Sequence, residues 1–180
     1  FYGGSMKVIV LAGKAGSGKN YLGEKLVYYA QKNHLRAVLT EYSKYLKLYA
    51  KELLNYDAQK DEKPRKFLQD IGSFVREKID ASFLVKRMLD DFYVYETCCD
   101  VVVISDARLI QEIEALKQSA YEVISIKVVQ SLFDSNLSLD EKKHVTELEL
   151  DDYQNFDYII ENKSKEEIEL FARNFFERRE

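Results

Sequence analysis

Glycine, lysine and serine residues are concentrated in one short segment near the start of the sequence. Residues 13–19 read Gly-Lys-Ala-Gly-Ser-Gly-Lys and match the pattern G-x-x-x-x-G-K, between an apolar run and an amphipathic segment. Glycines let the backbone wrap around phosphate oxygens so that N–H groups point inward, and the start of a helix adds partial positive charge. Lys19 would reach the β- and γ-phosphates of a nucleotide. The segment therefore predicts a phosphate-binding loop (P-loop). The residues predicted to bind the nucleotide are Gly13, Lys14, Ala15, Gly16, Ser17, Gly18, Lys19, Asn20 and Tyr21.

Two side chains that carry oxygen are predicted to hold Mg²⁺ beside this loop. Asn20 follows Lys19, where a serine or threonine hydroxyl usually coordinates the ion, and its amide oxygen is a weaker ligand. Asp106 follows the apolar run 101–105, and ligands of parallel sheets bind at the carboxyl ends of strands. We predict ATP and Mg²⁺ as cofactors, with Lys19, Asp106 and Arg108 as catalytic residues. The alternative for Asp106 is that it caps the helix that follows it.

A second group of polar side chains is spaced as one stripe of a helix. Arg65, Gln69 and Arg76 follow one another at intervals of four and seven residues. Two guanidinium groups and an amide suit a phosphate monoester with its sugar or base. Lys47 and Arg108 would add positive charge from other elements. These five residues are predicted to bind a phosphorylated acceptor, although a solvated helix face would produce the same pattern.

Apolar periodicity predicts the elements that must position these residues. Strands are expected at 7–12, 36–41, 100–105, 121–129 and 157–161, and helices at 19–33, 43–55, 64–79, 82–95, 109–119 and 164–178. A short helix is also expected near His144. Strands that alternate with helices favour a parallel sheet covered on both faces. We predict an α/β chain with a three-layer α/β/α P-loop fold and a roughly five-stranded parallel sheet. It forms one domain, 6–180, with an acceptor-binding region at about 42–96 and a lid at about 130–152.

Several segments, taken in order, resemble the bacteriophage-type deoxynucleoside monophosphate kinases, within the nucleoside-monophosphate-kinase-like P-loop kinases. The resemblance runs from Met6 to about Phe171. It is carried by Gly18-Lys19-Asn20, by Lys44 to Lys47, by residues 64–72 with Arg76, by Ser105-Asp106-Ala107-Arg108 with Glu112, and by His144-Val145-Thr146-Glu147. The resemblance implies transfer of the γ-phosphate of ATP to a (deoxy)nucleoside monophosphate, with the helix from Pro64 on the acceptor side.

The predicted lid departs from the family pattern, in which arginines clamp the transferring phosphate. Residues 128–152 contain no arginine, and Lys142 and Lys143 are their basic candidates besides His144. A lysine lacks the bidentate fork of a guanidinium group. Two alternatives therefore stay open. One is a kinase for another small phosphorylated acceptor, of the phosphomevalonate or dephospho-coenzyme A type, and the other is a nucleotide-binding module without turnover.

Bulk composition limits the partners. A net charge of −4 over 180 residues argues against a bulk nucleic-acid binder, and no apolar run approaches the roughly 20 residues that cross a bilayer. The adjacent Cys98 and Cys99, read as small apolar residues before a buried strand, offer no disulfide framework and fit a reducing compartment. We interpret residues 1–5 as the remnant of an expression tag, with Met6 as the natural start. We expect a cytoplasmic protein with a small-molecule partner, no nucleic acid and no membrane, and leave a homodimer open.

Overall fold

Five parallel strands form the centre of the molecule. The computed structural model describes residues 5–54, 64–130 and 150–177, without the side chains of residues 54, 64 and 65. The strands are β1 (Lys7–Ala12), β2 (Ala37–Thr40), β3 (Val101–Ala107), β4 (Glu122–Gln130) and β5 (Tyr158–Asn162), in the sheet order β2-β3-β1-β4-β5. The described helices are α1 (Lys19–Lys32), α2 (Ser43–Leu54), α3 (Pro64–Lys78), α4 (Phe83–Cys98), α5 (Ile110–Lys117) and α8 (Lys165–Glu177). None of them is long and apolar enough to cross a bilayer.

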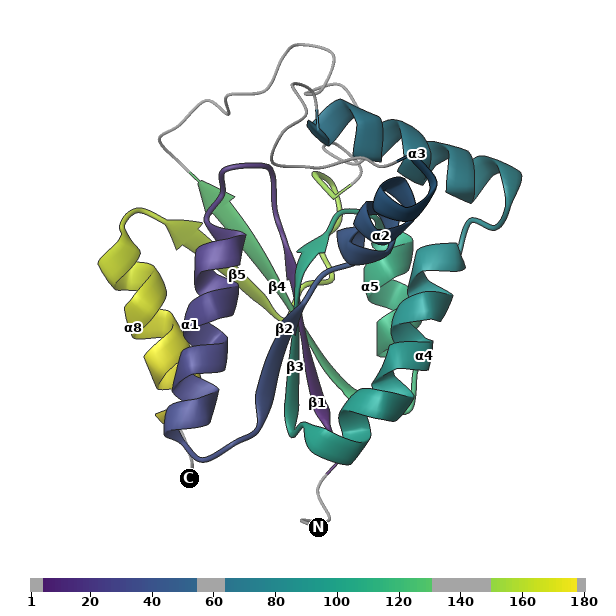
Figure 1. The fold of residues 1–180 in the computed structure, drawn as a ribbon. Helices are drawn as coiled ribbons and strands as arrows, with labels where there is room; N and C mark the ends of the chain where they lie inside the picture. The colour runs from purple at the N-terminus through teal and green to yellow at the C-terminus, as the bar shows by residue number, and fades with distance from the viewer. Residues whose placement is uncertain (1–4, 55–63, 131–149, 178–180) are drawn as a thin grey trace.

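Helices cover both faces of the sheet, as Figure 1 shows, with α1 and α8 on one side and α2 to α5 on the other. The alternation of side chains along a strand explains the two layers. Val8 and Val10 of β1 belong to the apolar cluster under α2, α4 and α5. Ile9 and Leu11 belong to the cluster under α1 and α8. Because both sets are fully buried, the continuous apolar run of β1 is that of a central strand. The predicted three-layer α/β/α P-loop fold is confirmed.

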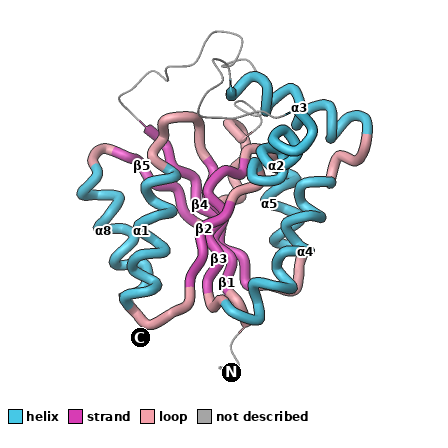
Figure 2. The backbone as a smooth tube through the Cα atoms, in the orientation of Figure 1, coloured by secondary structure: helices cyan, strands magenta, loops and turns pink. Residues whose placement is uncertain are grey.

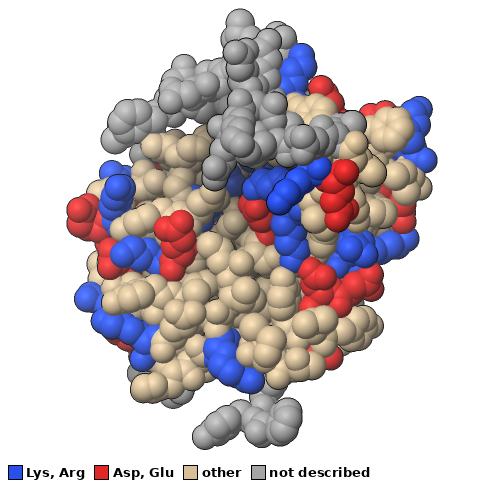
Figure 3. All heavy atoms as spheres, in the orientation of Figure 1, with Lys and Arg blue, Asp and Glu red and all other residues tan. Residues whose placement is uncertain are grey.

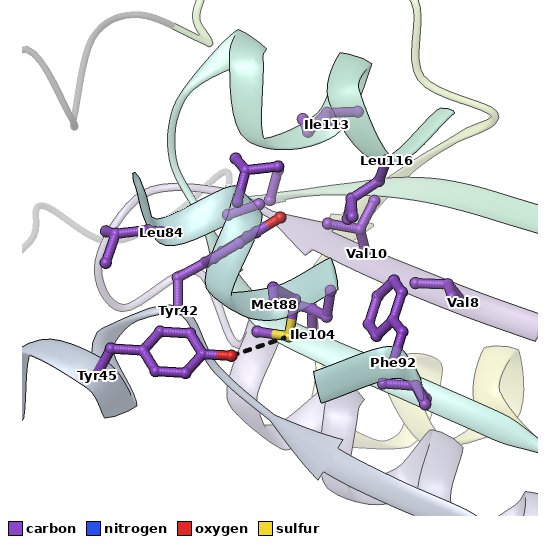
Figure 4. Packing of buried hydrophobic residues seen from close by; sticks show 14 of the residues in the cluster. Val8, Val10, Tyr42, Tyr45, Leu84, Met88, Phe92, Ile104, Ile113 and Leu116 are labelled. Carbon is purple, nitrogen blue, oxygen red and sulfur yellow. Dashed lines mark hydrogen bonds between the residues drawn. The ribbon is translucent and has the colours of Figure 1, made fainter. Parts of the chain in front are cut away.

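The core between the sheet and α4 is built from aromatic and flexible side chains. The ring of Phe92 is fully buried and meets Tyr121 edge to face, with 5.1 Å between ring centroids. The Tyr45 hydroxyl points at the sulfur of Met88, 3.9 Å away, and Figure 4 shows this contact close to the Phe92 ring and Val8. These contacts fix α2 and α4 against the sheet, and so fix the side of the molecule where the acceptor was expected.

The chain leaves the carboxyl ends of β1 and β3 in opposite directions. From β1 it passes through α1 to β2, beyond β3, and from β3 it passes through α5 to β4, beyond β1. The connections that follow β1 and β3 lie at the same end of the sheet, where the carboxyl ends of the parallel strands meet (Figure 2). A crevice forms where neighbouring strands diverge in this way, and it is the usual ligand site of open α/β sheets.

The observed element ends lie close to the predicted ones, with two informative differences. β3 continues to Ala107, and it contains one more residue than β1 between the pairs Val10–Ile104 and Ala12–Ala107. This irregularity is a bulge that apolar periodicity cannot indicate. α4 continues to Cys98, three residues beyond the expected end, so that the exposed Cys98 ends this helix and the half-buried Cys99 lies between it and β3. The helix expected near His144 lies outside the described residues.

Core packing on α4 gives the first prediction. Phe92→Ala should lower the free energy of unfolding by about 3–5 kcal/mol, because it removes a fully buried ring and leaves a cavity. The matched control is Tyr93→Ala on the same helix, where the ring is 69% exposed and the change should stay within about 0.5 kcal/mol. Urea denaturation measures both values. Equal losses in the two variants would contradict the packing described for α4.

Candidate functional site

The loop between β1 and α1 has a backbone that only glycine accommodates at two positions. Gly13 has φ of 150° and Gly18 has φ of 93°, where other residues are strained. A Cβ atom on Gly13 would lie 2.4 Å from the carbonyl oxygen of Val128, and one on Gly18 would lie 2.4 Å from Nδ2 of Asn162. The glycines that define the sequence motif are therefore required by the geometry of the loop.

Polar groups inside the loop suit an anion. The side chain of Lys19 is almost fully buried, and its ammonium donates to the carbonyl oxygen of Lys14 at 3.1 Å. Ser17 is 2% exposed, and its hydroxyl has no hydrogen-bond partner among the described residues. An unsatisfied buried hydroxyl costs free energy that a ligand oxygen would recover. Inward-facing glycine backbone, a buried lysine and this hydroxyl together fit nucleotide phosphates.

Asn162, at the end of β5, is hydrogen-bonded to the backbone of the P-loop. Its side-chain amide donates to the carbonyl oxygen of Ser17 at 2.9 Å. The sequence analysis missed this residue, because an asparagine that ends a strand is common and nothing local links it to residues 145 positions earlier.

A cleft of about 590 Å³ opens beside the loop at the carboxyl ends of β1 and β3. It is bounded by the loop, the segment that leads into α2, the inner side of α3, and the start of α5. Predicted site residues that line it are Ala15, Gly16, Gly18, Lys19, Asn20, Lys47, Gln69, Arg76, Asp106 and Arg108. The structure thus brings the predicted donor and acceptor residues into one cavity.

Other predicted site residues do not line this cleft. The Lys14 ammonium pairs with Asp151 at 2.8 Å. The Tyr21 hydroxyl donates to Glu169 of α8 at 3.2 Å, so this ring faces α8 and not the cleft. Gly13 and Ser17 lie within the loop itself. The Arg65 side chain and residues 131–149 of the predicted lid (about 130–152) lie outside the described residues.

Asp106 holds the start of α2. One carboxylate oxygen accepts from the backbone N–H of Tyr42 at 2.7 Å, and the other accepts from that of Ser43 at 3.0 Å. The alternative that Asp106 caps the following helix is therefore wrong, since it caps α2 from the bulge of β3. Both oxygens keep a lone pair, and with Asn20 in the same lining they offer the hard oxygen donors that Mg²⁺ prefers. No cluster of three acidic, histidine or cysteine residues with metal-site geometry occurs in the described ranges.

Glu112, in the first turn of α5, is a buried carboxylate that lines the cleft. It accepts from the backbone N–H of Arg108 at 2.7 Å and from that of Leu109 at 3.1 Å, both through Oε2. The pKa of Glu112 is raised to about 7, mainly by burial and also by the charge of Asp106, whereas the two hydrogen bonds and the charge of Arg76 oppose the rise. The sequence showed Glu112 as part of a family-like segment, but apolar patterning gave no sign that it is buried.

The inner side of α3 presents an amide and a guanidinium group to the cleft. Nε2 of Gln69 is buried and has no hydrogen-bond partner among the described residues. The guanidinium group of Arg76 lies over Gly72, where a Cβ atom would be 3.3 Å from it. Gln69 and Arg76 of the predicted stripe therefore lie in the wall of the cleft, where both side chains are half-buried.

An ion pair near the start of α2 adds further polar groups to the cleft. Lys47 pairs with Glu41 at 2.5 Å, and both residues line the cavity. Lys44 turns to α4 and pairs with Asp91. Tyr42 is 2% exposed and therefore belongs to the core. On the face in Figure 3, Lys and Arg side chains gather with acidic ones over α2 and α3, whereas the lower middle is largely uncharged.

Comparisons with known proteins support the fold at low sequence identity. No protein-family model matches the sequence, and no curated protein matches it. The Mycobacterium tuberculosis APS kinase CysC, in complex with AMPPNP and APS, superposes with a TM-score of 0.58 at 15% identity over 96% of each chain. A shikimate kinase from Bacteroides thetaiotaomicron superposes with a TM-score of 0.50 at 17% identity, over 97% of this chain and 98% of that one.

The raised pKa of Glu112 generates the second prediction. Below about pH 4.5 the carboxyl is protonated in both folded and unfolded chains, and between pH 4.5 and 7 only the folded chain keeps the proton. The stability of the wild type relative to Glu112→Gln should therefore fall as pH rises through this window, by on the order of 3 kcal/mol, and stay low above pH 7. Urea denaturation at pH 5 and pH 8 measures the difference. Glu24→Gln, at an exposed position of α1, is the control, and a pH-independent difference for Glu112→Gln would contradict the assignment.

Proposed function

We propose that the chain is an ATP-dependent phosphotransferase that moves the γ-phosphate of ATP to a small phosphorylated acceptor, a (deoxy)nucleoside monophosphate. The observation that carries the proposal is the shared cleft, in which the P-loop lysine Lys19 and the acceptor-side residues Arg76, Gln69 and Lys47 line one cavity. Because both phosphate-binding sets open to the same space, two phosphorylated molecules can meet there.

The donor side is the P-loop. Its backbone N–H groups and Lys19 would hold the β- and γ-phosphates, and the start of α1 adds a partial positive charge. Asn20 and Asp106 would hold Mg²⁺, directly or through water, and the ion would neutralise charge on the transferring phosphate. Asp106 also has a structural role that does not depend on the ion, because its carboxylate fixes the start of α2 at the edge of the cleft.

The acceptor side combines charge with an amide. Arg76 and Arg108 offer planar guanidinium groups that match phosphate oxygens. Gln69 offers a buried N–H donor that has no partner among the described residues, which suits an oxygen or ring nitrogen of the acceptor. Phosphoryl transfer depends mainly on alignment and charge neutralisation, so a cleft of this kind needs no covalent nucleophile of its own.

Fold similarity supports the ATP-dependent kinase part of the proposal and not the choice of acceptor. The similar structures include an APS kinase described in complex with AMPPNP and APS, and a shikimate kinase. The two alternatives from the sequence remain distinct hypotheses. A phosphomevalonate-type or dephospho-coenzyme A-type acceptor would use the same cations, and the absence of arginine from residues 128–152 favours a nucleotide-binding module without turnover.

A substrate panel tests the proposal and forms the third prediction. ADP release should be seen with at least one deoxynucleoside or ribonucleoside monophosphate, and not with phosphomevalonate or dephospho-coenzyme A. ATP with Mg²⁺ at a hundredfold excess over its Kd should raise Tm by about 5–10 °C, and Lys19→Ala should remove most of this shift. Retention of the shift in the mutant would mean that nucleotide binds elsewhere. Binding of ATP without turnover of any panel member would favour the binding module.

Removal of single arginines gives the fourth prediction. Arg76→Ala and Arg108→Ala should each lower kcat/KM for the acceptor by about 10- to 150-fold, since each loses a charge-assisted hydrogen bond. Arg76→Ala should mainly raise the acceptor KM, and Arg108→Ala should mainly lower kcat, because Arg108 follows β3, which pairs directly with β1, the strand that leads into the P-loop. Arg173→Ala on α8, in the opposite helix layer, is the control and should change neither. Wild-type acceptor kinetics in both cleft variants would exclude this cavity as the acceptor site.

A further inference from the structure

Two carboxylates of the cleft share one bonding pattern. Asp106 and Glu112 each accept hydrogen bonds from two consecutive backbone N–H groups. The groups bonded to Asp106 begin α2, and those bonded to Glu112 join β3 to α5. Carboxylates commonly bond backbone amides at a helix start, but here both lie in the lining of one cavity, to which the described residues contribute four cationic side chains.

We propose, on the basis of the proposed function, that Glu112 is a positioning residue that holds Arg108 in the cleft. The main-chain N–H of Arg108 donates to Oε2 of Glu112 at 2.7 Å, and that of Leu109 donates to the same atom at 3.1 Å. These two residues form the whole connection between β3, which ends at Ala107, and α5, which begins at Ile110. The carboxylate therefore fixes the short segment from which the Arg108 side chain extends.

Local sequence explains why a buried side chain is needed for this purpose. The residue that precedes α5 is Leu109, whose side chain contains no hydrogen-bond acceptor. It cannot satisfy the first N–H groups of the helix in the way that serine or aspartate would. Glu112, at the third position of α5, supplies the other half of a capping box, because its carboxylate reaches back to the N–H groups of Leu109 and Arg108, which precede the helix. This carboxylate thereby orders a connection that the Leu109 side chain cannot cap.

A further hydrogen bond extends this control to the acceptor side. The Tyr42 hydroxyl donates to the main-chain carbonyl oxygen of Glu112 at 2.9 Å. The backbone N–H of Tyr42 is in turn bonded to Asp106. The start of α5, the bulge of β3 and the start of α2 are thus linked by buried and partly buried hydrogen bonds around Glu112. A displaced Glu112 would move Arg108 relative to Lys47 and Arg76, without removing any group that touches the donor.

A double-mutant cycle tests the positioning role. Glu112→Ala should lower kcat/KM for the acceptor about 10-fold, mainly through kcat, and leave the KM for ATP unchanged. In the Arg108→Ala background the same change should cost less than about 2-fold, because Glu112 acts through Arg108. Glu112→Gln should stay within about 3-fold of wild type, since its amide oxygen accepts the same two N–H groups. Glu24→Ala on the exposed side of α1 is the matched acidic control. Additive losses in the cycle would overturn the proposal and indicate that Glu112 touches the acceptor itself.

A second measurement does not require turnover. Hydrogen-exchange NMR should show that the amides of Arg108 and Leu109 exchange at least about 10-fold faster in Glu112→Ala, whereas the Val103 amide in the centre of the sheet is unchanged. If Val103 also loses protection, the variant is globally unstable, and the cycle is then measured with Glu112→Asp, which shortens the reach of the carboxylate. Unchanged exchange at Arg108 and Leu109 would overturn the inference while leaving the proposed function intact. A different outcome is that the wild type turns over no monophosphate while Glu112→Ala still shows the faster exchange at Arg108 and Leu109. That outcome would overturn the proposed function and the catalytic purpose of the positioning.

Discussion

The arrangement of the cleft depends on carboxylates bonded to backbone N–H groups at the end of β3. Asp106 fixes the start of α2, and Glu112 fixes the connection to α5. A carboxylate that accepts two N–H bonds is compensated for part of the solvation that it loses on burial. The wall of the cleft that carries Lys47 and the strand end that carries Arg108 are thereby held to one strand, while the P-loop is held to the neighbouring strand, β1.

The remaining free-energy penalty is visible in Glu112, because burial holds the pKa of its carboxyl near 7 and not at its usual value. Such a group destabilises the folded chain when it is ionised. The presence of this carboxylate in the lining of the cavity is therefore explained by the geometry that it imposes on Arg108 and not by a gain in stability. Gln69 gives a similar indication on α3, since its buried Nε2 has no partner among the described residues. Local stability is given up in the cleft, whereas the apolar clusters on both faces of the sheet are closely packed.

Much of the fold and of the P-loop could be predicted from the sequence, because both depend on local patterns. The run from Lys7 to Ala12 and the glycines that follow it are sufficient to place a buried strand, a turn and a helix. The β3 bulge could not be predicted, since it is a difference in residue count between two strands that are distant in the sequence. Asn162 was missed for a related reason, because its side chain bonds Ser17, a residue 145 positions earlier in the sequence. Asp106 lines the cleft, but its bonds to the start of α2 depend on the bulge and so could not be predicted from the sequence.

The central position of β1 has a consequence for the order in which the chain can fold during synthesis. Lys7 is paired with Val101 on one side and with Glu122 on the other. Strand β1 therefore leaves the ribosome well before its neighbours β3 and β4, and it forms both ladders through contacts of large sequence separation. Its apolar side chains stay exposed for that time, which is the condition under which nascent chains associate with chaperones or with one another.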